Sequence, residues 1–272
     1  MKKRYLAILV PLLVSIVLLV SFFAGTMTAS AAPAPVSSVT VGDVTLNASN
    51  PATDGASFSN GILTLTQDAS VGAISASGGT LTVYVNGNNT VTNSAGNGIS
   101  MTSGTLNIKG SGTLNIVVSG NGINGVASSA DLAVSISENV NVSIQNASRG
   151  VYIDAQTAGR NLSFALTDAA TLDICTSGVP FYILGNQKAM NSTVKLTSTG
   201  VSNFERTAEN SVFLIEKSRN TVVEIKNGTY NMEQTAVGQN GNAAVRFDSY
   251  AGIPYDNSTQ IDVTIEDATL NV

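Results

Sequence analysis

Short runs of alternating hydrophobic and polar residues recur along most of the chain, and glycine or asparagine separates them. The clearest stretch is 79–116, where the segments 81–85, 105–108 and 113–116 alternate apolar and polar positions. Alternation with a period of two sends one set of side chains inward and the other to solvent, which predicts short β-strands. Glycine and asparagine tolerate the left-handed backbone angles of sharp corners. The pattern therefore predicts short strands joined by tight corners.

These segments fall into three series that recur in the same order. The first series runs from 81–85 to 261–265, the second from 90–92 to 269–271, and the third from 98–101 to 245–247. A fixed repeat of this kind indicates a solenoid, because one coil cannot bury its apolar face and stacked coils can. We predict an all-β fold, a single-stranded parallel β-helix with three short strands per coil and about six to seven coils. The strong preference of parallel crossovers predicts a right-handed helix.

The N-terminal residues have the three parts of a secretory signal peptide, which we assign to residues 1–31. Lys2, Lys3 and Arg4 precede an apolar run over 6–23, and small residues at 29–31 form a cleavage site. Since the apolar run is slightly long, an uncleaved N-terminal membrane anchor is the alternative.

The remaining chain is predicted to have two parts. Residues 32–60 are expected to form a linker and an N-terminal entry segment that caps the first coil, and residues 61–272 form the parallel β-helix domain. The signal peptide predicts a secreted, extracellular protein associated with the cell surface.

Composition narrows the possible partners. The chain of 272 residues is 43% hydrophobic and 11% charged, which argues against disorder. Its formal net charge is −5, and removal of 1–31, with three bases and no acids, leaves −8. An acidic protein is a poor ligand for nucleic acid, so we expect no nucleic-acid partner. Cys175 is the single cysteine, which excludes an internal disulfide.

The third series predicts an aromatic strip on the outer surface. Alternation places Tyr152, Tyr182 and Phe213 outward on three successive coils. Exposed aromatic faces are natural platforms for the apolar faces of sugar rings. The alternative interpretation is a stabilising cross-strand ladder, or a strip covered by a loop.

The second series predicts a candidate calcium site. Its outward positions include Asp173 and Glu205 about one coil apart, a separation of about 4.8 Å. Two carboxylates that close repel each other unless a cation lies between them or one is protonated. Calcium binds carboxylate and amide oxygens, so the candidate ligands are Asp173, Glu205, Asn141 and Asn231. A solvated acidic pair with a lysine or arginine nearby is the alternative.

The same carboxylate pair also raises the question of catalysis. A separation of about 5 Å suits a retaining glycosidase, but the partner groups expected around such a pair are missing from the repeat. The chain contains no histidine to activate a nucleophile. We therefore predict no catalytic residues and no enzyme activity.

Five segments carry a resemblance to a known group of proteins. "VTVGDVTL", "GILTLTQDASV", "LTVYVNGNNTVTNS", "GISM" and "LNIKGSGTLNI" resemble secreted clostridial-type surface proteins of Gram-positive bacteria, which are carbohydrate-binding, pectate-lyase-like β-helix proteins, some of them adhesins. The likeness covers 39–123 well and the rest only through its period. It implies non-catalytic binding of an extracellular polysaccharide, acidic and pectin-like or cellulose-like, with calcium as an accessory cofactor.

Two functions follow as hypotheses. The first is a non-catalytic extracellular protein that binds polysaccharide or acts as an adhesin, and the second is a structural rod of the cell envelope without a glycan ligand. A polysaccharide lyase or glycoside hydrolase ranks below both. The strands at 261–265 and 269–271 have no cap in the sequence pattern. We therefore expect either that a loop such as 248–259 covers the last coil or that its open edge self-associates.

Overall fold

The structure is a computed structural model that describes residues 33–208, 211–235, 244–249 and 260–272. The chain divides into two compact units, Met1–Ala32 and Pro33–Val272. The first unit, with the predicted signal peptide, lies outside the described residues, and the second contains all of the strands described below. No helix in the described part of the chain is long and apolar enough to cross a membrane.

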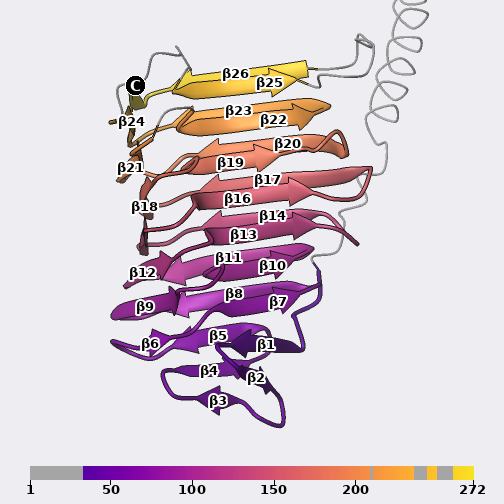
Figure 1. The fold of residues 1–272 in the computed structure, drawn as a ribbon, viewed down its shortest axis with the longest axis vertical. Helices are drawn as coiled ribbons and strands as arrows, with labels where there is room; N and C mark the ends of the chain where they lie inside the picture. Colours follow the sequence, from indigo (N-terminus) through magenta and orange to yellow (C-terminus); the bar gives the residue numbers. More distant parts are fainter. Residues whose placement is uncertain (1–32, 209–210, 236–243, 250–259) are drawn as a thin grey trace, which may run out of the picture. The chain divides into compact units, whose positions relative to one another are not determined.

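The described residues form stacked strands in three sheets (Figure 1), which we name sheets A, B and C. Sheet A comprises β3 (Ala52–Thr53), β4 (Ala56–Ser59), β5 (Ile62–Leu65), β8 (Thr80–Val85), β11 (Gly104–Gly110), β14 (Leu132–Ile136), β17 (Arg160–Leu166), β20 (Ala189–Leu196), β23 (Asn220–Lys226) and β26 (Gln260–Glu266). Sheet B comprises β1 (Ser38–Val41), β2 (Val44–Asn47), β7 (Ile74–Ser77), β10 (Ile99–Thr102), β13 (Asn121–Ala127), β16 (Arg149–Ala155), β19 (Phe181–Leu184), β22 (Phe213–Ser218) and β25 (Val245–Ser249). Sheet C comprises β6 (Ser70–Val71), β9 (Asn88–Asn93), β12 (Thr113–Val118), β15 (Asn141–Gln145), β18 (Thr171–Thr176), β21 (Val201–Arg206), β24 (Thr229–Gln234) and β27 (Thr269–Asn271).

From β5 onward the chain visits the sheets in the constant order A, C, B. Each strand from β8 to β24 pairs in parallel with its equivalents in the coils before and after it, as β11 does with β8 and β14. The predicted fold class, an all-β parallel β-helix with three strands per coil, is confirmed.

The core lies between the three sheets and follows directly from the alternation in sequence. In β11, Leu106 and Ile108 are fully buried, whereas the alternate residues Thr105 and Asn107 are partly exposed. The parallel register stacks equivalent apolar residues of successive coils, so each coil covers the inward side chains of its neighbour. Burial of one apolar row per strand stabilises a structure that no single coil could maintain.

Two corners require glycine for steric reasons. Gly104 and Gly110 have φ angles of +90° and +131°, which L residues rarely adopt. A Cβ at either position would lie 2.1 Å from a carbonyl oxygen of the preceding coil. These corners therefore fix where β11 begins and ends.

The N-terminal end of the coil stack is covered by antiparallel strands. β1 and β2 form a hairpin, and β1 also pairs antiparallel with β7. β4 pairs antiparallel with both β3 and β5. These pairings give partners to the edges of β5 and β7 in the first coil, which would otherwise be open to association.

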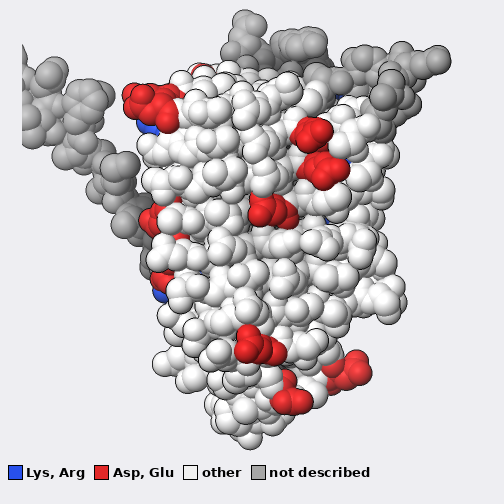
Figure 2. Space-filling view, turned by 90° about the vertical axis from the view of Figure 1, so that its left-hand side faces the viewer, with Lys and Arg blue, Asp and Glu red and all other residues white. Residues whose placement is uncertain are grey.

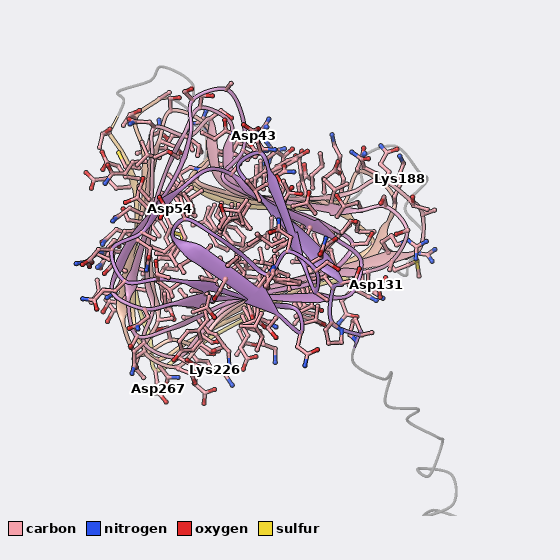
Figure 3. The ribbon with its side chains drawn as sticks, turned by 90° about the horizontal axis from the view of Figure 1, so that it is seen from below. Asp43, Asp54, Asp131, Lys188, Lys226 and Asp267 are labelled. Carbon is pink, nitrogen blue, oxygen red and sulfur yellow. The ribbon has the colours of Figure 1, made fainter. Side chains whose placement is uncertain are left out.

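Several charged side chains lie at the rim of the coils. Viewed from below (Figure 3), the labelled residues Asp131, Lys188, Lys226 and Asp267 lie at the periphery, and side chains fill the space between the sheets. Functional groups are therefore to be sought on the outer faces of the three sheets and at their corners.

Candidate ligand-binding face

Tyr152 and Tyr182 lie side by side on the outer face of sheet B. They occupy equivalent positions of β16 and β19, and both side chains are half-buried. Their ring centroids are 5.4 Å apart and the ring planes meet at 61°, an edge-to-face pair. The predicted stacking of these two tyrosines on successive coils is present in the structure.

Arg149 extends this pair. Its guanidinium carbon lies 4.7 Å from the ring centroid of Tyr152 and 5.6 Å from that of Tyr182. A guanidinium within about 6 Å of an aromatic face is attracted by the negative charge of that face. The three side chains therefore support one another and form a combined aromatic and cationic surface, which we call the Arg–Tyr face.

A carboxylate holds one edge of the Arg–Tyr face in place. Glu216 of β22 accepts a hydrogen bond of 2.5 Å from the Tyr182 hydroxyl. Burial, followed by the bond to Glu216 and its charge, holds the pKa of the Tyr182 hydroxyl well above its ordinary value. The pKa of Tyr152 is also raised, first by burial and then by the charge of Asp154. Both rings thus remain neutral and keep their faces apolar.

Asp154 is a second acid on this face, and it is 6% exposed. Its Oδ2 accepts a hydrogen bond of 3.4 Å from Gln156, while its Oδ1 is buried without a partner. Burial raises the pKa of this carboxyl group, and Gln156 and Lys188 oppose that shift.

Sequence reasoning did not select Arg149, Asp154 or Glu216 for this face. Asp154 could have been found, since it stands two residues after Tyr152 and so points to the same side.

The prediction that Phe213 belongs to the outer strip is wrong. Phe213 is fully buried and lies parallel to Phe181 in the core, with centroids 4.3 Å apart and planes 4° apart. Its register partner is Phe181, and Leu214 occupies the position beside Tyr182. The segment 212–215 consists of four successive apolar residues, so alternation could not tell inward from outward positions.

The predicted pairing of Asp173 with Glu205 in sheet C is also wrong. Asp173 is in register with Asn203, and Glu205 is in register with Cys175. Asn141 is in register with Thr171, whose hydroxyl donates a hydrogen bond of 2.8 Å to it. Each error is a slip of two residues, which keeps every side chain on its predicted face and so leaves the apolar pattern unchanged.

The outer column of sheet C that contains Asp173 is an amide ladder. Asn203 donates to Asp173 at 2.7 Å, Asn231 donates to Asn203 at 2.6 Å, and Asn271 donates to Asn231 at 2.7 Å. The ladder begins at Asp173, because a carboxylate accepts hydrogen bonds and has no N–H group to donate to the preceding coil. Its Oδ1 also accepts the backbone N–H of Asn203 at 3.1 Å.

The four candidate calcium ligands do not converge. Asp173 and Asn231 belong to the amide ladder but are separated by Asn203, whereas Glu205 and Asn141 belong to other columns. Among the residues that the structure describes, no group of three or more cysteine or acidic side chains is placed to hold a metal ion. Figure 2 shows the face over sheet C, where scattered acidic side chains interrupt a largely uncharged surface. The arrangement favours hydrogen bonding within the protein over ion binding on this face.

Cys175 lies beside Glu205 on the same face and is exposed. Partial desolvation raises the pKa of its thiol, and the charge and hydrogen bond of Glu205 raise it further. A thiol with a raised pKa is mostly protonated at neutral pH and is a poor nucleophile.

No family model, no curated protein and no solved structure matches the chain. The fold and the Arg–Tyr face are therefore the basis on which a function can be proposed.

Proposed function

We propose that this protein is a non-catalytic, extracellular polysaccharide-binding or adhesive protein, and that the Arg–Tyr face is its binding surface. The observation that carries the proposal is the adjacency of Tyr152, Tyr182 and Arg149 on the outer face of sheet B. Neutral aromatic rings stack on the apolar faces of sugar rings, and an arginine donates hydrogen bonds to hydroxyl or carboxylate oxygens.

The charged groups of this face suit a polar ligand, and the spacing of its two tyrosines suits a repetitive one. Arg149 provides a cation for an acidic sugar, while Glu216 provides an acceptor for a sugar hydroxyl. Because Tyr152 and Tyr182 lie on successive coils, the two rings can contact neighbouring parts of one extended chain. A pectin-like or cellulose-like polysaccharide is therefore the proposed ligand, and the signal-like sequence of residues 1–31 is consistent with secretion to meet it.

The test begins with a glycan array, probed with and without calcium to include the cofactor hypothesis. For a glycan that binds, the double variant Tyr152→Ala/Tyr182→Ala should weaken affinity by about tenfold or more, which corresponds to about 1.4 kcal/mol. Tyr84→Ala is the matched control, because Tyr84 is an exposed tyrosine on β8 of sheet A. Equal affinity of the double variant and the control would refute the proposal.

A structural rod of the cell envelope is the second candidate function. The amide ladder of sheet C favours it, since side-chain hydrogen bonds along the coils stiffen a solenoid without any ligand. An array on which no glycan binds would favour this alternative. A reducing-sugar assay on pectins and glucans separates both candidates from a lyase or glycoside hydrolase, because the proposal predicts no release of sugar ends.

A further inference from the structure

The inward-facing apolar side chains of β26, the last strand of sheet A, are exposed, whereas the equivalent side chains of the preceding coil are buried. Ile261, Val263 and Ile265 of β26 are 38%, 43% and 52% exposed. Their register partners on β23, which are Thr221, Val223 and Ile225, are only 2%, 0% and 1% exposed. The three residues of β26 therefore point inward, and in the described residues no further coil covers them.

We propose that a second copy of this chain covers this edge, with the two β26 strands paired antiparallel about a two-fold axis. At the opposite end of the coil stack, sheets A and B end in the short antiparallel strands β3 and β2, which have two and four residues, and not in a strand of a coil. Head-to-tail stacking would therefore offer β26 no strand of matching length in sheet A, whereas tail-to-tail contact offers it a second seven-residue β26. Such a contact is self-complementary and closes after two subunits.

Geometry fixes the direction of pairing. For the apolar interior of one copy to meet that of the other, the two-fold axis must run perpendicular to sheet A. That operation reverses the strand direction, so β26 meets its copy antiparallel. Residues directly opposite each other in an antiparallel pair point to the same side, so an inward residue must face an inward residue. In β26 the inward residues have odd numbers. Only registers that place odd-numbered residues opposite odd-numbered ones, and even-numbered opposite even-numbered ones, satisfy this condition.

Charge selects one of these registers. With Val263 opposite Val263 of the other copy, all seven residues of β26 pair. Ile261 then faces Ile265, Asp262 faces Thr264, and Gln260 faces Glu266, so no acid faces an acid. A shift by one residue toward either end of the strand places Asp262 opposite Asp262 or opposite Glu266, which is unfavourable. The register centred on Val263 thus combines the longest overlap with hydrogen-bonding pairs on the outer face.

The direct test is the variant Thr264→Asp, examined by analytical ultracentrifugation over a range of protein concentrations. Thr264 lies on the outer face, so the change leaves the core untouched, but it places a second carboxylate opposite Asp262 of the other copy, and the two-fold axis repeats this repulsive contact. We expect the dissociation constant of the dimer to rise by about tenfold or more. The control Thr82→Asp, at an outer position of β8 far from this edge, should dimerise as the unmodified chain does.

A charge exchange provides the second measurement. In the double variant Asp262→Lys/Thr264→Asp, each introduced lysine faces an introduced aspartate of the other copy, and dimerisation should return. Circular dichroism of each variant verifies that the β-helix is folded. An unmodified chain that remains monomeric at every concentration would overturn the proposal. So would a dimer that Thr264→Asp does not weaken, or one that the charge exchange does not restore.

Discussion

Tyr230 is a fully buried tyrosine in the core of the solenoid. Its hydroxyl lies 3.1 Å from the carbonyl oxygen of Ser198 and 3.3 Å from that of Lys226, and it donates to these acceptors. Burial raises the pKa of Tyr230 to about 12. A buried phenol with a raised pKa links the stability of the fold to alkaline pH.

The sign of this link follows from the two pKa values. In the unfolded chain a tyrosine has a pKa of about 10, so the unfolded state loses its proton first as the pH rises. Below about pH 10, the ionisation of Tyr230 should not change the free energy of unfolding. It should then fall by up to about 1.4 kcal/mol per pH unit between about pH 10 and 12.

Urea unfolding at a series of pH values measures this fall. The variant Tyr230→Phe removes the titrating group, so its stability should decline less steeply over the alkaline range, although it starts lower because the hydroxyl contacts are lost. Identical slopes for the two proteins would show that Tyr230 is not responsible.

Individual site residues differ in how well the sequence predicts them. Tyr152 and Tyr182 could be assigned to the outer face because each bears a polar hydroxyl and stands between two wholly apolar residues, at 151 and 153 and at 181 and 183. Phe213 could not be assigned, because residues 212–215 are all apolar and the sequence does not show which of them point inward. The place of Arg149 on this face could not be predicted either, because its long side chain reaches the two rings in three dimensions and no spacing rule in the sequence indicates that contact.

At the level of strands, amide ladders connect the coils outside the core. A second ladder in sheet A has the same form as that of sheet C. Asn161 donates to Asp131 at 2.7 Å, Asn191 to Asn161 at 2.6 Å, and Asn220 to Asn191 at 3.0 Å. Both ladders begin with an aspartate and continue with asparagines that all donate toward the N-terminal end. This shared direction makes the hydrogen bonds of each ladder mutually reinforcing.

Removal of an internal rung should therefore cost more than removal of a terminal one. Asn203→Ala loses a side-chain bond to Asp173 and another to Asn231, and we expect it to lower the free energy of unfolding by about 1–2 kcal/mol. Asn271→Ala loses one side-chain bond and should cost about half as much. Chemical denaturation measures both. Equal and negligible effects would mean that water replaces these exposed bonds without loss.

Strand positions follow from the sequence more reliably than strand register. Every inward apolar position of β18 and β21 obeys the period of two, yet Asp173 faces Asn203 and not Glu205. A slip of two residues preserves the buried and exposed faces, so hydrophobicity supplies no energy to distinguish the alternatives. Contacts at the corners favour one register, such as the close approach of Gly200, just before β21, to Ala170 and Thr171 at the start of β18.

At the scale of the whole β-helix domain, the two proposals concern separate surfaces. The Arg–Tyr face lies on sheet B, whereas the proposed dimer contact is formed by the edge of β26 in sheet A. Variants of one surface should therefore leave the other function intact, since distant sites without shared partners act independently. Thr264→Asp should bind glycan as well per subunit as the unmodified chain, and Tyr152→Ala/Tyr182→Ala should still dimerise.

The central claim is that sugar rings contact Tyr152 and Tyr182. The most direct measurement is nuclear magnetic resonance of the protein labelled with ¹³C in its tyrosine rings, titrated with an oligosaccharide of the glycan that the array selects. Single Tyr→Phe variants assign the signals. We predict that the ring signals of Tyr152 and Tyr182 shift with added sugar and saturate together, while those of Tyr84 and the buried Tyr230 stay in place. Shifts confined to other tyrosines, or binding with no change at Tyr152 and Tyr182, would contradict it.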